Sequence, residues 1–319
     1  MTRFGYTLSS EEHPPKDLVR HAVVAEERNF DFVAISDHYH PWTTSQGHSP
    51  FVWSVLGAIA ASTDRIRVGV GVTCPTVRIH PAVIAQAAAT TSLLMDDRFF
   101  LGLGTGEALN EHILGHHWPP PEVRAAMLLE AIDVIRQLWT GDTVDVHGEF
   151  YDVENARLFD PPTNPIPLVL SAFGKHSATT IARAGDGYWG TSPDPEVLQA
   201  YSDAGGTGPR YAQLTVCWAA DDDTARRTVH RQWPNGALPG QLAQELPTWT
   251  HIEQAASVLS VEQTTEDIPC GPGPDAFVEQ VRTYLDAGYD RLYFHQVGPD
   301  QQGFFDFWTE ELEPALSQL

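Results

Sequence analysis

The feature that most restricts the fold of this chain is a repeated alternation of two kinds of segment. Short runs rich in β-branched and aromatic residues recur along the 319 residues, and most precede a stretch with helical periodicity. Eight runs are strand candidates: RFGYTLS (3–9), FDFVAISDH (30–38), RIRVGVGVT (65–73), FFLGLGTG (99–106), PLVLSAF (167–173), YWGTS (188–192), YAQLTVCWAA (211–220) and DRLYFHQVG (290–298). Repeated βα units with strands apolar on both faces favour a parallel sheet, and eight favour a closed (β/α)8 TIM barrel. An open doubly wound sheet is the alternative.

One segment, 219–268, interrupts this rhythm. It contains DDDTARR and WPNGALPGQLAQELPTW and follows the seventh strand candidate. Because βα loops of a barrel emerge at its catalytic rim, we expect a helical insertion at that rim; a peripheral decoration is the alternative. A hairpin is expected in VDVHGEFYDVENARL (144–158). No repeat, low-complexity tract or linker marks a second domain, so residues 1–319 are predicted to form a single domain.

Composition restricts the partners. The formal net charge is −23, from 42 acidic and 19 basic residues, which disfavours binding to nucleic acid or to an anionic membrane. No apolar run is long enough to cross a membrane, and MTRFGYTLSS lacks the apolar region of a secretory signal, so a cytoplasmic location is the default expectation. Three scattered cysteines, Cys74, Cys217 and Cys270, are expected to be reduced thiols.

The stretch FVAISDHYHPW (32–42) places polar side chains where a buried strand ends. Asp37, His38 and Trp42 would lie at the mouth of a barrel, and Glu107 in GLGTGEALNE follows the fourth strand in the same way. A carboxylate, an imidazole, an aromatic wall and a second carboxylate suffice for proton transfer beside a planar ligand. The alternative is a pair of residues that only caps a loop.

Two glycine-containing turns are candidates for phosphate binding. In GLGTG the glycines fall at 102, 104 and 106, which does not match the dinucleotide-binding spacing, although backbone N–H groups there could still approach a phosphate. Relief of crowding at the end of the barrel explains them equally well. In AFGKHSATT (172–180), Gly174 permits close approach, Lys175 is one of two lysines, and Ser177 is a candidate helix cap.

A metal site is not expected. His38 and His40 resemble the metal-binding pair of an amidohydrolase barrel, but the later strand ends SAFG and GTSP provide no further ligands. His112, His116 and His117 are interpreted as surface residues of a loop.

Six motifs are similar, in order, to those of the luciferase-like (β/α)8 barrel superfamily: SDHYHPW, HPAVIAQAAAT, FFLGLGTGEALNE, IRQLWTGD, ARAGDGY and FHQVGPDQQGFF. Within it the chain resembles the branch of coenzyme F420-dependent glucose-6-phosphate dehydrogenase. Flavin-dependent members are less similar, so the resemblance implies F420 rather than FMN, and a homodimer.

The resemblance also implies roles for individual residues. His38 would be the general base, Trp42 the wall of the reacting centre and Glu107 a proton donor, and Glu11 matches a further active-site acid. Asp37 would hold the deazaflavin ring, and a non-proline cis peptide bond would join Gly71 and Val72. The remaining residues implied to bind the coenzyme are Thr105, Gly106, Asn110, Ala172, Phe173, Gly174 and Lys175.

The residues expected to bind the substrate differ from those of this branch. Its sugar-phosphate enzymes bind phosphate through lysines and an arginine of late βα loops, whereas TSPDPEV here has Asp194 at the expected lysine, and 232–281 contains no Lys or Arg. We therefore expect an F420-dependent oxidoreductase acting on a non-phosphorylated alcohol, sugar hemiacetal, carbonyl or imine. The alternatives are a sugar-phosphate dehydrogenase, an FMN-dependent monooxygenase, a metal-dependent hydrolase and a non-catalytic coenzyme-binding protein.

Overall fold

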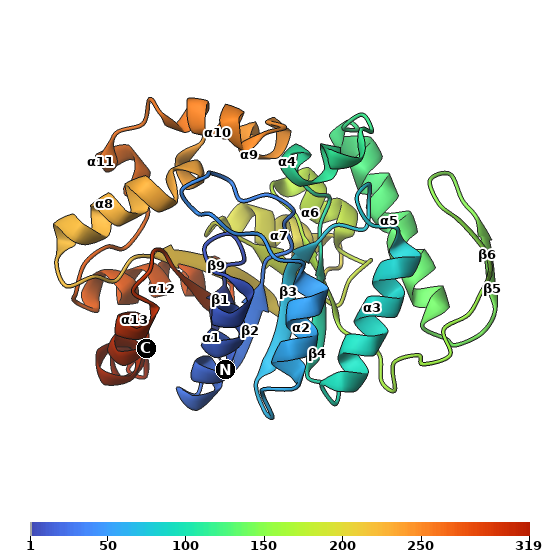
Figure 1. Cartoon of the computed structure of the whole chain (residues 1–319), viewed down its shortest axis with the longest axis horizontal. Helices are drawn as coiled ribbons and strands as arrows, with labels where there is room; N and C mark the ends of the chain where they lie inside the picture. Colours follow the sequence, from blue (N-terminus) through green and yellow to red (C-terminus); the bar gives the residue numbers. More distant parts are fainter. Residues whose placement is uncertain (1) are drawn as a thin grey trace.

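The computed structural model describes residues 2–319, and its centre is a closed barrel of parallel strands in the order β1-β10-β9-β8-β7-β4-β3-β2 (Figure 1). Its strands are β1 (Arg3–Leu8), β2 (Phe32–Ile35), β3 (Arg67–Thr73), β4 (Phe99–Leu103), β7 (Leu168–Ser171), β8 (Gly187–Gly190), β9 (Arg210–Val216) and β10 (Arg291–Gln296). Six lie within the predicted runs, and β8 and β9 each begin one residue before theirs. The prediction of a TIM barrel is confirmed, and the alternative of an open sheet is wrong.

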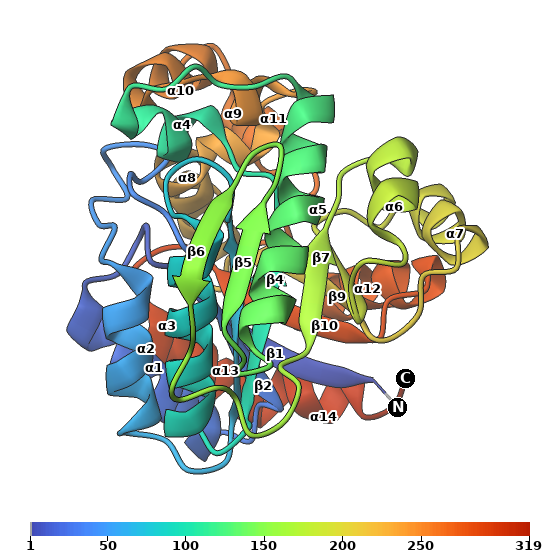
Figure 2. The ribbon, with the colours of Figure 1, turned by 90° about the vertical axis from the view of Figure 1, so that its right-hand side faces the viewer.

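Helices surround this barrel (Figures 1 and 2). They are α1 (Pro15–Glu27), α2 (Val52–Ala60), α3 (Pro81–Leu94), α4 (Ala108–Glu111), α5 (Pro121–Leu138), α6 (Lys175–Ile181), α7 (Pro195–Asp203), α12 (Asp275–Ala287), α13 (Gln301–Phe307) and α14 (Glu313–Leu316), with a 3-10 turn η1 (His112–Leu114) and a π-helical turn η3 (Trp308–Leu312). The predicted helix cap at Ser177 is wrong. The cap of α6 is three residues earlier, because Gly174 adopts a positive φ (94°) and turns the chain into the helix there.

The predicted hairpin consists of β5 (Val144–His147) and β6 (Asp152–Ala156), paired antiparallel. Figure 2 shows it on the outside of the barrel, in front of α5. The carboxylate of Glu130 in α5 accepts hydrogen bonds from the backbone N–H groups of Phe150 (3.0 Å) and Tyr151 (2.8 Å). This attachment holds the hairpin against the outer face of α5.

The insertion after β9 is helical, as predicted. It contains α8 (Asp222–Gln232), the 3-10 turn η2 (Pro234–Ala237), α9 (Leu242–Glu245), α10 (Trp249–Ala256) and α11 (Val261–Thr264). Figure 1 shows these helices at the same end of the molecule as α4. The side chain of Gln46, in the loop after β2, donates to Gln232 O (3.0 Å) and Asn235 Oδ1 (3.2 Å). The insertion therefore packs on a loop that leaves the carboxyl ends of the strands.

Two layers of apolar side chains hold the barrel. The larger layer lies between strands and helices, and the smaller one fills the barrel with Phe32, Ala34, Phe100, Val169, Trp189, Tyr211 and Tyr293. The rings need space on β3: a Cβ on Gly69 would lie 2.2 Å from Phe100 Cζ, and one on Gly71 would lie 2.3 Å from Trp189 Cζ2. The register of β3 shifts after Val70, and Gly71–Val72 is a cis peptide bond, as expected from the resemblance.

Two further expectations concern the cysteines and the membrane. Cys74 and Cys217 are buried free thiols and Cys270 is a half-buried one. Among residues 2–319, no helix combines the length and the apolar character that a membrane crossing requires.

The imidazole of His21 makes stability depend on pH. It lies on α1, 5% exposed, with Nδ1 unpaired and its ring 4.9 Å from that of His13. Burial, together with His13, lowers the pKa of His21 to about 3. Below pH ~6.5 the unfolded chain binds a proton at His21 that the folded chain does not. The free energy of unfolding therefore decreases by about 1.4 kcal/mol for each unit by which the pH is lowered.

We therefore expect unfolding free energy to fall by about 2 kcal/mol between pH 6.5 and pH 5 on account of His21 alone. Urea denaturation of the protein and of His21→Phe at both pH values gives the change in unfolding free energy between pH 6.5 and pH 5 for each. The difference between these two changes is the contribution of His21. An equal change with pH in the two proteins would show that His21 is protonated in the folded state.

Candidate active site

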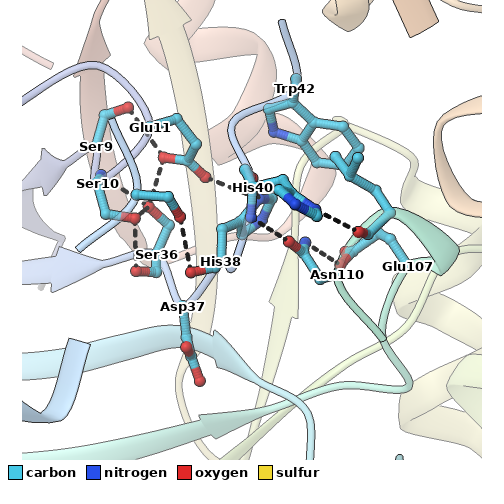
Figure 3. A network of polar contacts seen from close by, with 12 residues as sticks. Ser9, Ser10, Glu11, Ser36, Asp37, His38, His40, Trp42, Glu107 and Asn110 are labelled. Carbon is cyan, nitrogen blue, oxygen red and sulfur yellow. Dashed lines mark hydrogen bonds and ion pairs between the residues drawn. The ribbon is translucent and has the colours of Figure 1, made fainter. Parts of the chain in front are cut away.

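Glu11 and His38 form a buried pair at the mouth of the barrel (Figure 3). Glu11, in the loop after β1, is 2% exposed, and its Oε2 accepts hydrogen bonds from Ser36 Oγ (2.6 Å) and Ser9 Oγ (3.1 Å). Its other oxygen, Oε1, lies 3.3 Å from Nδ1 of His38. Two hydroxyl groups thus fix a carboxylate that faces the imidazole.

The surroundings of His38 determine which ring nitrogen carries the proton. Nδ1 lies 3.3 Å from Glu11 Oε1 and 3.3 Å from the backbone oxygen of His40, and both groups can only accept when Glu11 is ionised. Nδ1 is therefore the protonated nitrogen, and Nε2 keeps a lone pair. The indole of Trp42 packs edge-on against this ring at 5.0 Å. The imidazole is 10% exposed, so part of its ring is open to the mouth.

Asn110 joins the loop after β2 to the loop after β4. Its Oδ1 accepts from the backbone N–H groups of Tyr39 (2.9 Å) and His40 (3.1 Å), and its Nδ2 donates to Glu107 Oε2 at 3.4 Å. Glu107 is half-buried, and Figure 3 shows it on the same side of His38 as Trp42. The structure thus brings together the four predicted catalytic side chains and one predicted coenzyme-binding residue.

Asp37 points away from this cluster (Figure 3). Its buried carboxylate pairs with Arg78 Nη2 at 2.9 Å and accepts a hydrogen bond from Thr73 Oγ1. Arg78 also lies 3.5 Å from Glu111 Oε1, and burial raises the pKa of Glu111. Although burial alone lowers the pKa of Arg78, its attraction to Asp37 and Glu111 raises it. Arg78 is therefore a permanent cation that pairs with the buried carboxylate of Asp37.

Sequence reasoning did not identify Arg78, Glu111 or the serines that hold Glu11. Arg78 had a usable signal, because it follows the third strand by a few residues and so lies near the same rim. Ser36 also had a usable signal, because it directly precedes Asp37 at the end of a strand. Glu111 ends the motif GLGTGEALNE, and its carboxylate accepts a hydrogen bond from the backbone N–H of Arg78 at 2.6 Å.

Val72 provides an apolar surface beside the polar cluster. Its half-buried side chain lies over β4, where a Cβ on Gly104 would be 2.7 Å from Val72 Cγ2 and one on Gly102 would be 3.0 Å from Val72 Cγ1. At these two positions the glycines relieve crowding, the second of the two explanations considered. A planar, largely apolar ring fits a surface of this kind, flanked by groups that can hold or release protons.

The residues expected at the tail of a coenzyme lie on neighbouring loops. Thr105 and Gly106 follow β4, and 172–175 follow β7, its partner strand in the barrel. Ala172 is buried, with its carbonyl accepting from Tyr188 OH at 2.7 Å, whereas Phe173, Gly174 and Lys175 are exposed. The ammonium group of Lys175 forms an ion pair with Glu196 on the surface.

The histidine-based metal hypotheses have no geometric support. Across residues 2–319, no three His, Cys, Asp or Glu side chains are grouped to hold a metal ion. His40 uses Nδ1 for the backbone oxygen of Leu109 at 3.1 Å, and its ring packs on Trp249 at 4.8 Å. His116 and His117 are exposed.

Comparison with known proteins gives the family. A family model described as luciferase-like monooxygenase matches residues 1–291. The F420-dependent glucose-6-phosphate dehydrogenase of Mycolicibacterium gilvum is 36% identical over 332 residues, covering 99% of this chain and 98% of that protein. The enzyme of the same name from Kribbella flavida is 37% identical, covering 99% of both chains.

Solved structures agree. An F420-dependent secondary alcohol dehydrogenase, in complex with an F420-acetone adduct, has a TM-score of 0.90 at 25% identity, with 99% of both chains covered. The coenzyme F420-dependent tetrahydromethanopterin reductase of Methanopyrus kandleri, at 20% identity and a TM-score of 0.78, shows the same fold over 99% of both chains. The chain belongs to the luciferase-like monooxygenase family.

Proposed function

We propose that this protein is a coenzyme F420-dependent oxidoreductase that moves a hydride between the deazaflavin and a carbon atom bearing a hydroxyl, carbonyl or imine group. The observation that carries the proposal is the imidazole of His38, whose Nδ1 faces Glu11 and whose Nε2 keeps a lone pair at the barrel mouth. The F420-dependent relatives, alike over nearly the whole chain, support the choice of coenzyme.

The residues that would hold the coenzyme fall into two sets. Val72, on its glycine-lined surface, would support the ring, and the loops after β4 and β7 would bind the tail through Thr105, Gly106, Asn110 and 172–175. Asp37 would act at the ring from its pair with Arg78. When bound, F420 supplies a carbon centre that accepts or returns a hydride.

The protein itself handles the proton. In the direction of oxidation, His38 Nε2 takes the proton of the substrate hydroxyl, because Nε2 keeps a lone pair and part of the ring is open to the mouth. Glu11, desolvated and held by two serines, stabilises the imidazolium that results. Trp42 closes one side of the reacting centre and Glu107 is positioned as a second proton donor.

Two observations favour different substrates. The glucose-6-phosphate dehydrogenases among the relatives favour the sugar-phosphate alternative. The charges here favour a non-phosphorylated substrate: Asp194 caps helix α7 by accepting from Glu196 N (2.9 Å), and Lys175 is paired with Glu196 at the surface. A buried phosphate dianion without cationic partners is strongly disfavoured by desolvation. We propose the non-phosphorylated substrate.

The coenzyme is tested directly by binding. Purified protein is expected to bind F420 much more tightly than FMN in calorimetric titrations, because the motifs SDHYHPW and GTGEALNE resemble those of the F420 branch. Tighter binding of FMN would place the protein with the monooxygenases of the family and would refute the proposed coenzyme.

Glucose 6-phosphate is expected to be a poor substrate. Two missing charge-assisted contacts at about 1.5–3 kcal/mol each predict a loss of more than a hundredfold in affinity. Steady-state oxidation of glucose 6-phosphate and of glucose with F420 measures this. A micromolar KM for the phosphorylated sugar would contradict the prediction and establish the sugar-phosphate alternative.

We also propose that the protein acts as a cytoplasmic homodimer on small molecules. This rests on the resemblance and on the acidic composition, with its net charge of −23, which opposes binding to polyanions. Light scattering of the purified protein tests the dimer.

A further inference from the structure

The barrel mouth contains a second buried pair of a histidine and a carboxylate, which the reaction proposed above does not use. His295, at the end of β10, lies with Nε2 2.6 Å from Glu12 Oε2, and the two side chains are 1% and 3% exposed. The other carboxylate oxygen of Glu12 accepts from the backbone N–H of Gly298 at 3.0 Å. The pair joins the first and last strands of the barrel.

His295 points into the barrel. Successive residues of a strand face opposite sides, and Tyr293, two residues earlier, belongs to the aromatic cluster that fills the barrel. On β9, Thr215 and Gln213 are the register partners of His295 and Tyr293. Both are half-buried, so solvent reaches this layer from the mouth. A polar layer thus lies above the aromatic floor.

The second ring nitrogen of His295, Nδ1, is a hydrogen-bond acceptor whose two partners in the protein are distant. Burial alone raises the pKa of Glu12, but attraction to His295, their hydrogen bond, nearby His13 and the N–H of Gly298 together lower it. An ionised Glu12 only accepts, so Nε2 of His295 carries a proton. Nδ1 faces the amide nitrogen of Gln213, which can only donate, so Nδ1 is the acceptor of the ring. Thr215 Oγ1 (3.4 Å) and Gln213 Nε2 (3.5 Å) approach Nδ1 only at the limit of hydrogen bonding.

Two neighbours complete this layer. Thr7 is the register partner of Ala34, which belongs to the interior cluster, so its side chain also faces inward. Its buried Oγ1 has no hydrogen-bond partner. The indole of Trp233, from the insertion, packs edge-on against His295 at 4.2 Å and covers it. The layer therefore offers an acceptor nitrogen and an unpartnered hydroxyl.

We propose that Nδ1 of His295 accepts a hydrogen bond from a second hydroxyl group of the substrate, and that Glu12 positions the ring for this contact. The inference rests on the proposed function and narrows it: the substrate is a polyhydroxy compound, with one hydroxyl at His38 and another at His295. A simple secondary alcohol uses only the first contact.

Two substitutions separate the roles of the ring nitrogens. The amide of glutamine reaches about as far as Nε2, so His295→Gln keeps the bond to Glu12 and removes the acceptor at Nδ1. The shorter asparagine places its amide near Nδ1, so His295→Asn keeps a polar group for the ligand and leaves Glu12 unpaired. His295→Gln is expected to raise the KM for a polyol about tenfold, the effect of one hydrogen bond of ~1.4 kcal/mol, without changing kcat or F420 affinity.

The probes are sorbitol, glucose and 1,2-propanediol, with isopropanol as the control that lacks a second hydroxyl. In His295→Gln the KM for isopropanol is expected to stay unchanged. His295→Asn is expected to affect the polyols less but to unfold at a lower temperature, because a buried carboxylate loses its partner. Equal changes for isopropanol and the polyols, or no change for either, would overturn the proposal.

A measurement without turnover keeps this test independent of the proposed reaction. In F420-loaded His38→Ala, the ¹⁵N resonance of His295 Nδ1 is expected to shift when a polyol is added and to stay in place with isopropanol. If no alcohol reduces F420 with the unmodified protein, the proposed function fails, and this spectrum still decides on His295. The absence of any shift with all three polyols would refute the inference.

Discussion

Replacing His38 by alanine is expected to lower turnover by about 10²- to 10⁴-fold, the usual contribution of a general base. The variant loses the lone pair at Nε2, while Val72 and the loops after β4 and β7 remain intact. F420 affinity, measured by calorimetry, is therefore expected to stay close to that of the unmodified protein. Steady-state rates with the best alcohol of a substrate screen measure the loss.

His40→Ala is the matched control for this change. His40 lies two residues away, but its ring is committed to the backbone oxygen of Leu109 and to Trp249, and only its carbonyl oxygen faces His38. Its removal is expected to change turnover by only a few fold. If His38→Ala stays within the same few fold, His38 is not the base.

Arg78→Met is expected to lower the free energy of unfolding by about 3–5 kcal/mol, because it leaves the carboxylate of Asp37 buried without its cation. The guanidinium is 7% exposed and the Asp37 carboxylate 0%, so water cannot replace the lost partner. Denaturant titration measures the change. Arg78→Met combined with Asp37→Asn is expected to recover part of the loss, since no uncompensated charge remains at position 37.

The control for this second prediction is Arg282→Met. Arg282 pairs with Glu279 on the surface of α12, where the two side chains are 50% and 68% exposed. Exposed pairs contribute about 1 kcal/mol or less. A similar small effect for Arg78→Met would mean that water enters the site around Asp37.

The barrel could be predicted from the sequence because each of its strands is an apolar run that needs burial on both faces. The candidate site could be predicted in part, since His38 and Glu107 each follow a strand, and all carboxyl ends of a parallel barrel meet at one rim. Such an argument places residues on the rim but does not orient them. Asp37 and His38 are neighbours in the sequence, yet they point in different directions, one to a buried arginine and one to the mouth.

Pairs between distant segments could not be predicted. Arg78 is separated from Asp37 by 41 positions, and His295 from Glu12 by 283, and no local pattern marks such partners. The cap of α6 shows a different limit of prediction from the sequence. Ser177 had the side chain that helix caps favour, but the positive φ at Gly174 started the helix before it.

The insertion and the proposed coenzyme surface occupy separate parts of the barrel. Val72 lies on β3, Gly102 on β4 and Gly104 directly after it, whereas Trp233 comes from the insertion and the polar layer from β1, β9 and β10. No side chain of the insertion is needed to form the surface under Val72. Changes in length or sequence within 219–268 can therefore accumulate during evolution, or be exchanged between homologues by design, and alter which molecules react while the same hydride chemistry is retained.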